Sequence, residues 1–336
     1  MSVMNVRLAR RPRRRLISTA AVAATTVLGL TTLSACSSSD AADGKNDGKL
    51  DVVASFYPMQ YLAQEIGGGH VDVSNLTEPG QEPHDLEVSA KQRAQIEESD
   101  VALYLKGLQP AVDEAIDQSG TKTKIDAASL TSLEKHGNEV GGHAEGHSDE
   151  DADGHDHDSE GSDPHIWLDP VKYAEVAEGV GKALEKADPD NAADYKKNTA
   201  ALLKKLDGLD TKFKDGLKDT GTDGSKVFIT THAAFGYLAE RYGLTEEAIN
   251  SLDPESEPSA ARVKDLQKMA KADGVTTVFY ETLVSDKTAK TLASDAKLKT
   301  AVLDPIEGIT DKSKGDDYLQ VMESNLAALR KSLGAK

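Results

Sequence analysis

The chain has 336 residues, of which 29% are charged and only 4% aromatic, and its formal net charge at pH 7 is -18. This acidic excess argues against a nucleic-acid partner, because phosphates require a basic protein surface, and it suits a cation as ligand. Cys36 is the only cysteine, so no intrachain disulfide stabilises the chain and a hydrophobic core must do so. The length is sufficient for two domains.

The first 35 residues have the pattern of a secretory signal. Six arginines precede an uncharged run, 16–33, which is followed by Ser34, Ala35 and Cys36. Small residues before a cysteine at this place resemble a bacterial lipobox, in which the thiol is lipidated. We therefore expect a signal peptide over 1–35 and a lipid anchor on Cys36 at the outer face of the cytoplasmic membrane. Plain secretion and an uncleaved signal anchor are alternatives, and the export route, general or twin-arginine, stays open.

Residues 36–49 are rich in Ser, Asp and Gly, which predicts a flexible tether. From residue 50 on, short apolar runs alternate with stretches of helical period, which predicts mainly parallel sheets with helices on both faces. The predicted strands are 50–55, 71–76, 101–105, 123–125, 227–230, 275–280 and 300–303. The predicted helices are 57–66, 90–98, 108–117, 171–186, 192–217, 233–242, 260–270, 287–296 and 318–332.

Two consecutive helices interrupt this alternation, and the second is long enough to span two domains. We therefore predict an α/β fold of two lobes: an N-terminal lobe over 50–190, a linker helix over 191–219 and a C-terminal lobe over 220–336. In open sheets of this kind, ligands bind beyond the carboxyl ends of the strands. We therefore expect the site residues to lie in the loops beyond the carboxyl ends of the strands.

Three of the nine histidines, His84, His165 and His232, stand alone beyond a predicted strand or before a predicted helix. A single histidine of this kind is more commonly structural, but three at equivalent positions favour a shared site. Imidazole nitrogen suits zinc, and three histidines with one oxygen donor form an ordinary tetrahedral shell. Glu307, just beyond the strand 300–303, is the candidate fourth ligand, although by itself it would be taken for solvated surface.

Other carboxylates could hold the imidazoles from behind instead of binding metal. The candidates are Glu82, Asp85, Glu281 and Asp304. The sequence does not assign them to particular histidines. Trp167, the only tryptophan, lies two residues beyond His165, and we expect it to anchor that loop in the core. His70 is given no role.

A polar insertion, 134–162, contains the remaining histidines, which are His136, His143, His147, His155 and His157. It combines them with Asp and Glu and lacks both apolar periodicity and regular ligand spacing. Such a composition is typical of a disordered, metal-attracting segment. We expect it to collect zinc weakly and pass it to the main site, and the alternative is a solvated linker with incidental metal affinity.

Four segments resemble the ligand motifs of the zinc/manganese solute-binding lipoproteins of ABC transporters. They are Glu-Pro-His-Asp at 82–85, Asp-Pro-His-Ile-Trp-Leu-Asp-Pro at 163–170, Thr-His-Ala-Ala-Phe-Gly-Tyr at 231–237 and Leu-Asp-Pro-Ile-Glu at 303–307. They follow the family's order, and the resemblance covers essentially everything from residue 50 on. It implies two lobes bridged by a long helix, with one metal held by His84 and His165 from the first lobe and by His232 and Glu307 from the second.

The resemblance also implies a monomeric receptor without catalytic residues that delivers its metal to the permease and ATPase subunits of an importer. The third imidazole, at His232, points to Zn²⁺, because manganese-selective members place a carboxylate there and manganese prefers oxygen ligands. By affinity order alone, copper(II) would bind more tightly than zinc. Selectivity would therefore also depend on geometry and metal supply. A manganese receptor of the same class stays an alternative.

Three alternative functions compete with this one. They are a surface adhesin or zinc buffer that uses the same site, a zinc hydrolase, and a receptor for metal chelates or vitamins. The hydrolase is disfavoured because the sequence lacks a His-Glu-x-x-His motif, a cysteine-based zinc motif and a Gly-x-Ser-x-Gly elbow. A carboxylate in the fourth metal position would also close the site to substrate. The chelate receptor is disfavoured because it needs a wide apolar or aromatic pocket, and aromatic residues are few.

Overall fold

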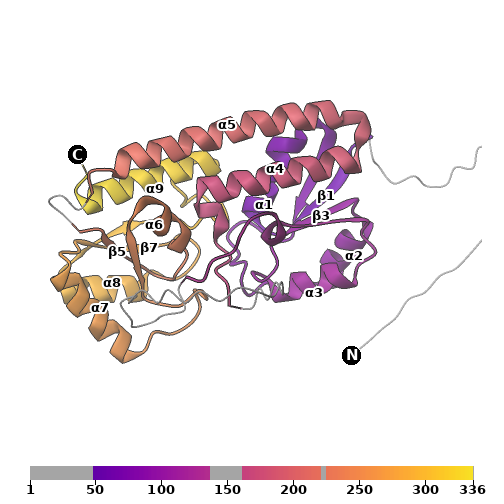
Figure 1. The fold of residues 1–336 in the computed structure, drawn as a ribbon. Helices are drawn as coiled ribbons and strands as arrows, with labels where there is room; N and C mark the ends of the chain where they lie inside the picture. The colour runs from indigo at the N-terminus through magenta and orange to yellow at the C-terminus, as the bar shows by residue number, and fades with distance from the viewer. Residues whose placement is uncertain (1–47, 137–160, 221–224, 336) are drawn as a thin grey trace, which may run out of the picture. The chain divides into compact units, whose positions relative to one another are not determined.

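The structure, a computed structural model, describes residues 48–136, 161–220 and 225–335. In these residues short strands alternate with α-helices along the chain (Figure 1). The strands are β1 (Leu50–Ala54), β2 (Val71–Asn75), β3 (Val101–Tyr104), β4 (Thr123–Asp126), β5 (Val227–Thr230), β6 (Thr245–Ala248), β7 (Thr277–Tyr280) and β8 (Lys299–Val302). The helices are α1 (Tyr57–Gly67), α2 (Ala90–Glu98), α3 (Pro110–Gln118), α4 (Pro170–Ala187), α5 (Ala192–Leu217), α6 (Gly236–Tyr242), α7 (Ala260–Ala272), α8 (Lys287–Ala296) and α9 (Tyr318–Leu333).

The strands of the described residues form two four-stranded sheets with the same topology. Their orders are β2-β1-β3-β4 and β6-β5-β7-β8, and all strand pairs are parallel. In each sheet the chain first crosses to one side and then returns to the other side of the first strand. Loops that leave the carboxyl ends at such a reversal diverge and leave room for a ligand.

Helices cover both faces of each sheet, because successive strand residues point to opposite faces. In β1, Val52 packs in a core with α1 and α4, whereas Val53 packs with α2 and α3 on the other face. In β5, Phe228 packs toward α6 and α9, whereas Ile229 packs with α7 and α8. Both strands are therefore almost wholly apolar, which is typical of parallel sheets buried on two faces. The predicted α/β fold class of two sheets flanked by helices is confirmed.

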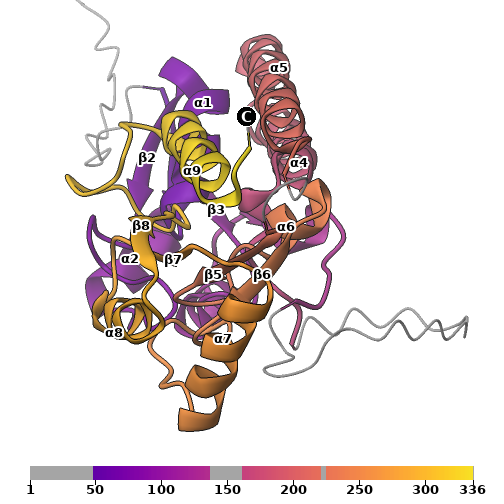
Figure 2. The ribbon, with the colours of Figure 1, turned by 90° about the vertical axis from the view of Figure 1, so that its left-hand side faces the viewer.

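The long helix α5 runs along both halves of the chain (Figure 1), and Figure 2 shows it nearly end-on beside α4. It contacts α1 and α4 of the first half and α6 and α9 of the second. Its buried residues recur at helical spacing, and Phe213 stacks on Tyr242 of α6 with ring centroids 5.1 Å apart. One continuous hydrophobic core thus includes residues from both sheets and from α5. This shared core sets the distance between the two halves.

Two predicted details differ from the structure. β6 was not predicted, because its sequence Thr-Glu-Glu-Ala has no apolar alternation. It is an edge strand that pairs only with β5, and acidic side chains are common on such edges because they hinder pairing with another chain. α6 begins at Gly236 and not at 233, so the segment 231–235 is a loop between β5 and α6.

Several expectations fall outside the described residues. These are the signal peptide over 1–35, the lipidation of Cys36, nearly all of the tether, and residues 137–160 of the polar insertion. In the described part of the chain, no helix combines the length and apolar character needed to cross a bilayer. α5 lies within the predicted linker helix 191–219, and the lobe boundaries drawn on either side of it stay a proposal.

Candidate metal centre

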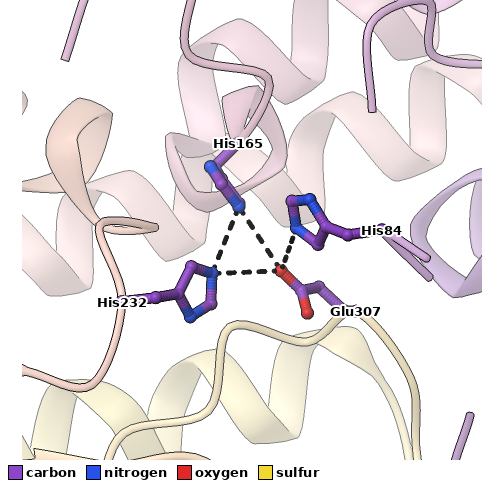
Figure 3. Close-up of side chains that lie close together, drawn as sticks. All are labelled: His84, His165, His232 and Glu307. Atoms are coloured by element: carbon purple, nitrogen blue, oxygen red, sulfur yellow. Dashed lines mark hydrogen bonds and ion pairs between the residues drawn. The ribbon is translucent and has the colours of Figure 1, made fainter. Parts of the chain in front are cut away.

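The four candidate ligands meet at one point, with the carboxylate of Glu307 facing three imidazole rings (Figure 3). Glu307 Oε1 lies 3.3 Å from Nε2 of His84 and 3.4 Å from Nε2 of both His165 and His232. One donor atom from each residue lies within 4.8 Å of the others. The side chain of His84 is 12% exposed, and the other three are buried. The structure thus brings together all four residues predicted as ligands.

The position of His232 follows from the pairing of β5 with β7. Ile229 of β5 pairs with Val278 of β7, and extending that parallel register by three residues puts His232 opposite Glu281. His232 Nδ1 lies 2.9 Å from Glu281 Oε1, and the Thr231 hydroxyl donates to the same oxygen. The carboxylate fixes the ring orientation and the tautomer, so Nε2 is left to face the centre.

His165 is held by a carboxylate from its own loop. Asp163 Oδ1 accepts from the backbone N–H of His165 at 2.9 Å and lies 2.7 Å from its Nδ1. Pro164 restricts the backbone between the two residues, which favours this local hydrogen bonding. Both Asp163 and His165 are fully buried, so the ring is fixed where water cannot compete. Nε2 again faces the centre.

His84 is the least enclosed ligand. It follows Pro83 in the loop between β2 and α2, and a backbone bond of 3.2 Å from Leu86 N to Pro83 O closes the turn. The side chain of Leu86 is buried in the core and anchors the loop. Glu82 Oε1 accepts from the backbone N–H of His84 at 3.1 Å. His84 is therefore the ligand through which solvent reaches the centre most directly.

Glu307 comes from a strained loop after β8. Ile306 has φ +61°, a left-handed conformation that costs a β-branched residue on the order of 1–3 kcal/mol. Asp304 Oδ1 accepts from Ile306 N at 2.8 Å, and Asn325 of α9 holds the Asp304 backbone through bonds of 2.7 and 2.9 Å. Trp167 Nε1 donates to Pro305 O at 2.7 Å, which ties this loop to the His165 loop. The surrounding contacts fix the loop in this strained conformation.

The charges of the site depend strongly on one another. Burial would raise the pKa of Glu307, but hydrogen bonds from the three histidines hold it well below its usual range. Burial disfavours the charged form of His232, but Glu281 and Glu307 raise its pKa well above the usual value. Burial also disfavours the charged form of His165, but hydrogen bonds with Asp163 and Glu307 raise its pKa. A divalent cation at the centre would replace the protons that these rings share with Glu307.

Three carboxylate oxygens near the centre are buried without a hydrogen-bond partner among the described residues. They belong to Glu307, Glu281 and Glu82. Burial and the charge of Glu307 raise the pKa of Glu82 to about 9. A buried acceptor without a donor costs on the order of 1–3 kcal/mol, and a bound cation would offset part of this cost.

The four carboxylates considered as supporting groups have different positions. Glu281 orients His232, Glu82 binds only the backbone of His84, Asp304 shapes the Glu307 loop, and Asp85 is exposed. Asp163, which orients His165, was missed. Its place two residues before His165 across a proline was the available signal, because short acidic side chains bind backbone N–H groups two residues on.

Of the five histidines in the polar insertion, only His136 is described. Its Nδ1 lies 3.0 Å from Asp163 Oδ2 and its Nε2 lies 3.0 Å from Glu240 Oε2. It thus has fixed partners next to the centre. His143, His147, His155 and His157 lie outside the described residues. His70 Nε2 is 2.9 Å from Asp194 Oδ2 at an exposed position and takes no part in the cluster.

Three nitrogens and one oxygen around a buried point match the tetrahedral shells that zinc prefers. All four donors come from the protein. A catalytic zinc instead keeps one position open for water or substrate. The arrangement is thus suited to holding an ion, and chemistry on a bound substrate would need a position that the shell does not leave free.

Comparison with known proteins gives the family. The sequence model of the family described as "Zinc-uptake complex component A periplasmic", abbreviated ZnuA, matches residues 52–332. The chain belongs to the ZnuA family. The resemblance inferred from the four ligand motifs is thereby confirmed.

Two curated ZnuA-family relatives are similar over most of this chain. The zinc-binding lipoprotein AdcA of Streptococcus pneumoniae is 37% identical over an alignment of 306 residues that covers 89% of this chain and 58% of AdcA. The high-affinity zinc uptake system protein ZnuA of Bacillus subtilis is 35% identical over an alignment of 313 residues that covers 90% of this chain and 94% of that protein. The chain thus spans little more than half the length of the AdcA relatives that it matches.

Solved structures of ZnuA-like proteins have the same fold. The Zn(II)-bound ZnuA-like domain of Streptococcus pneumoniae AdcA superimposes with a TM-score of 0.69 at 33% identity. The match covers 85% of this chain and 99% of that domain. At this identity the likeness supports a common architecture, in agreement with the two parallel sheets described above.

Trp167 offers a direct reporter of the centre, because its ring lies 5.2 Å from the ring of His165. We expect Zn²⁺ to change the tryptophan emission of the wild-type protein, since a cation at Nε2 alters the field at the indole. His165→Ala should abolish the change, and His70→Ala, which alters a histidine outside the cluster, should preserve it. A zinc response that persists unchanged in His165→Ala would remove His165 from the site.

Proposed function

We propose that this protein is an extracytoplasmic receptor that captures Zn²⁺ through His84, His165, His232 and Glu307 and delivers it to an ABC-type importer. The observation that carries the proposal is the buried cluster of three imidazole nitrogens around one carboxylate oxygen. Membership of the ZnuA family and the likeness to a Zn(II)-bound domain support zinc as the cargo. The protein acts as a binding receptor and not as an enzyme, because its shell leaves no position for a substrate.

The donor set favours zinc over manganese. Three imidazoles are borderline ligands, whereas manganese prefers shells that are rich in oxygen. His232 and His165 are each backed by a carboxylate, Glu281 and Asp163, which raises the basicity of the ring and strengthens its bond to a Lewis-acidic ion. Copper(II) would outcompete zinc by affinity order, so discrimination against it depends on geometry and supply.

Export and membrane anchoring complete the proposal. The signal pattern of 1–35 and the lipobox-like position of Cys36 support a lipid anchor at the outer face of the cytoplasmic membrane. The description of the family as periplasmic and the name lipoprotein of the pneumococcal relative agree with this location. The partners are the permease and ATPase subunits of the importer, and the receptor works as a monomer.

Zinc enters and leaves the proposed site past His84. Ligand exchange on a buried ion requires an incoming water or donor, and His84 is the most exposed of the four ligands. Its loop is held by the short turn at Pro83 and by the anchor Leu86, whereas the other ligands are fixed in the buried core. Release to the permease therefore begins with the loss of His84.

Metal analysis of the protein purified without added metal tests the cargo. We expect one zinc per chain and tighter binding of zinc than of manganese in competition. His232→Ala should weaken zinc binding by more than about 100-fold, and Glu281→Gln, which keeps all four ligands and weakens the support of His232, by about 10–100-fold. His70→Ala should bind like the wild type. Stoichiometric manganese in the purified protein would overturn the assignment.

Growth in zinc-depleted medium tests delivery. Cells that lack this chain should grow poorly there, and either added zinc or the wild-type gene should restore growth. His232→Ala should fail to restore it although the protein is exported at normal levels, whereas His70→Ala should succeed. Normal growth of cells without the chain would instead favour a buffer or an adhesin that uses the same site.

A further inference from the structure

We infer that His136 is a positioning residue of the metal centre, which fixes Asp163 so that Asp163 can orient the ligand His165. The inference rests on the proposed function, because it assigns a second layer of support to the same site. It separates His136 from the other histidines of the polar insertion and gives it a role that does not require it to bind metal.

Asp163 is bonded through both oxygens of its carboxylate. Oδ1 binds the backbone N–H and Nδ1 of His165, at 2.9 and 2.7 Å, and Oδ2 lies 3.0 Å from His136 Nδ1. The carboxylate is fully buried. Without His136, Oδ2 would be a charged acceptor with no other hydrogen bond from the described residues, and the carboxylate could rotate away from His165.

His136 is itself held in place on several sides. Its Nε2 lies 3.0 Å from Glu240 Oε2, and its ring forms a T-shaped pair with the ring of Tyr237 at a centroid distance of 4.5 Å. Gly236 makes room for this arrangement, because an added Cβ there would lie 2.4 Å from His136 Cβ and 3.0 Å from Asp163 Oδ2. The ring is 20% exposed, much less than an imidazole on a solvated loop.

The backbone around Asp163 is tied to the same place. Asp163 N donates to Glu134 O at 2.9 Å, which joins the chain segments on either side of residues 137–160. The Tyr237 hydroxyl accepts from Glu134 N and donates to Asp163 O, each at 2.8 Å. These bonds lie within the described residues. The link from His136 to Asp163 is therefore built without any contribution from the histidines at 143–157.

The charge of His136 supports the same role. Both ring nitrogens face carboxylate oxygens, and only the doubly protonated imidazolium can donate to both. Burial opposes this charge, but the hydrogen bonds and charges of Asp163 and Glu240 outweigh it and raise the pKa of His136. Asp163, held by His136 through Oδ2, accepts from Nδ1 of His165 through Oδ1 and so leaves Nε2 of His165 to face the centre.

Zinc affinity and the visible spectrum of the Co²⁺-loaded protein, measured on the full chain, test the inference. We expect His136→Ala to weaken zinc binding by about 10–100-fold and to change the Co²⁺ spectrum, because His165 loses its fixed orientation. His136→Asn, whose amide can still donate to Asp163, should restore most of the affinity. A deletion of residues 141–158, which removes the other four histidines of the insertion, should bind zinc like the wild type.

Glycine variants give a steric test in which residue 136 remains a histidine. Gly236→Ala should displace His136 from Asp163 and weaken zinc binding, whereas Gly208→Ala, at a helical position with no atom near the added Cβ, should not. Wild-type affinity with an unchanged Co²⁺ spectrum in His136→Ala would overturn the inference. A loss equally large in the 141–158 deletion would also overturn it. Absence of zinc binding by the wild-type protein would instead refute the proposed function.

Discussion

The structure depends on the burial of one carboxylate, Glu307, in contact with three imidazoles and with no lysine or arginine paired to it among the described residues. An ionised carboxylate in such a place is costly unless a positive charge accompanies it. That charge can come from protons shared with the histidines or from a metal cation that displaces them. A metal cation fits this site better than shared protons do, because one ion can bind the three imidazole nitrogens and the Glu307 carboxylate at once.

The fold brings these groups together by repeating one topology. In each half, a four-stranded parallel sheet presents its loops at the carboxyl ends of the strands, and His84, His232 and Glu307 follow β2, β5 and β8. The core shared by both sheets and α5 fixes the distance between these ends. Trp167 adds a direct bond between the loops of His165 and Glu307. The fold therefore holds the four donors in fixed relative positions, which is the preorganisation that a metal site requires.

A layer of carboxylates behind the imidazoles completes this preorganisation. Glu281 and Asp163 each hold the Nδ1 of one histidine, so that Nε2 is the free donor. The two carboxylates are supported differently. Glu281 follows directly from strand register, whereas Asp163 depends on contacts from His136 and Tyr237 that converge from separate parts of the chain. The strained backbone of Ile306 persists because the contacts of the Glu307 loop hold it in the left-handed conformation.

The sequence was sufficient to predict the α/β fold class and the four converging residues. Strand and helix periods were regular, and each ligand stood beside a strand end or a helix start within a recognisable motif. The residues that support the ligands were harder to predict from the sequence. Glu281 was one of four candidates, because its pairing with His232 depends on the register of β5 against β7. Asp163 had a local signal in its place two residues before His165, whereas its contact with His136 joins the two sides of the polar insertion, and no local pattern encodes that contact.

Anomalous diffraction at the zinc absorption edge, from crystals of the protein loaded with one equivalent of Zn²⁺, tests the central claim most directly. The account predicts a single strong peak bonded to Nε2 of His84, His165 and His232 and to a carboxylate oxygen of Glu307, at about 2.0–2.2 Å from each. A principal peak elsewhere, or a zinc ion bound by fewer than three of these residues, would contradict it.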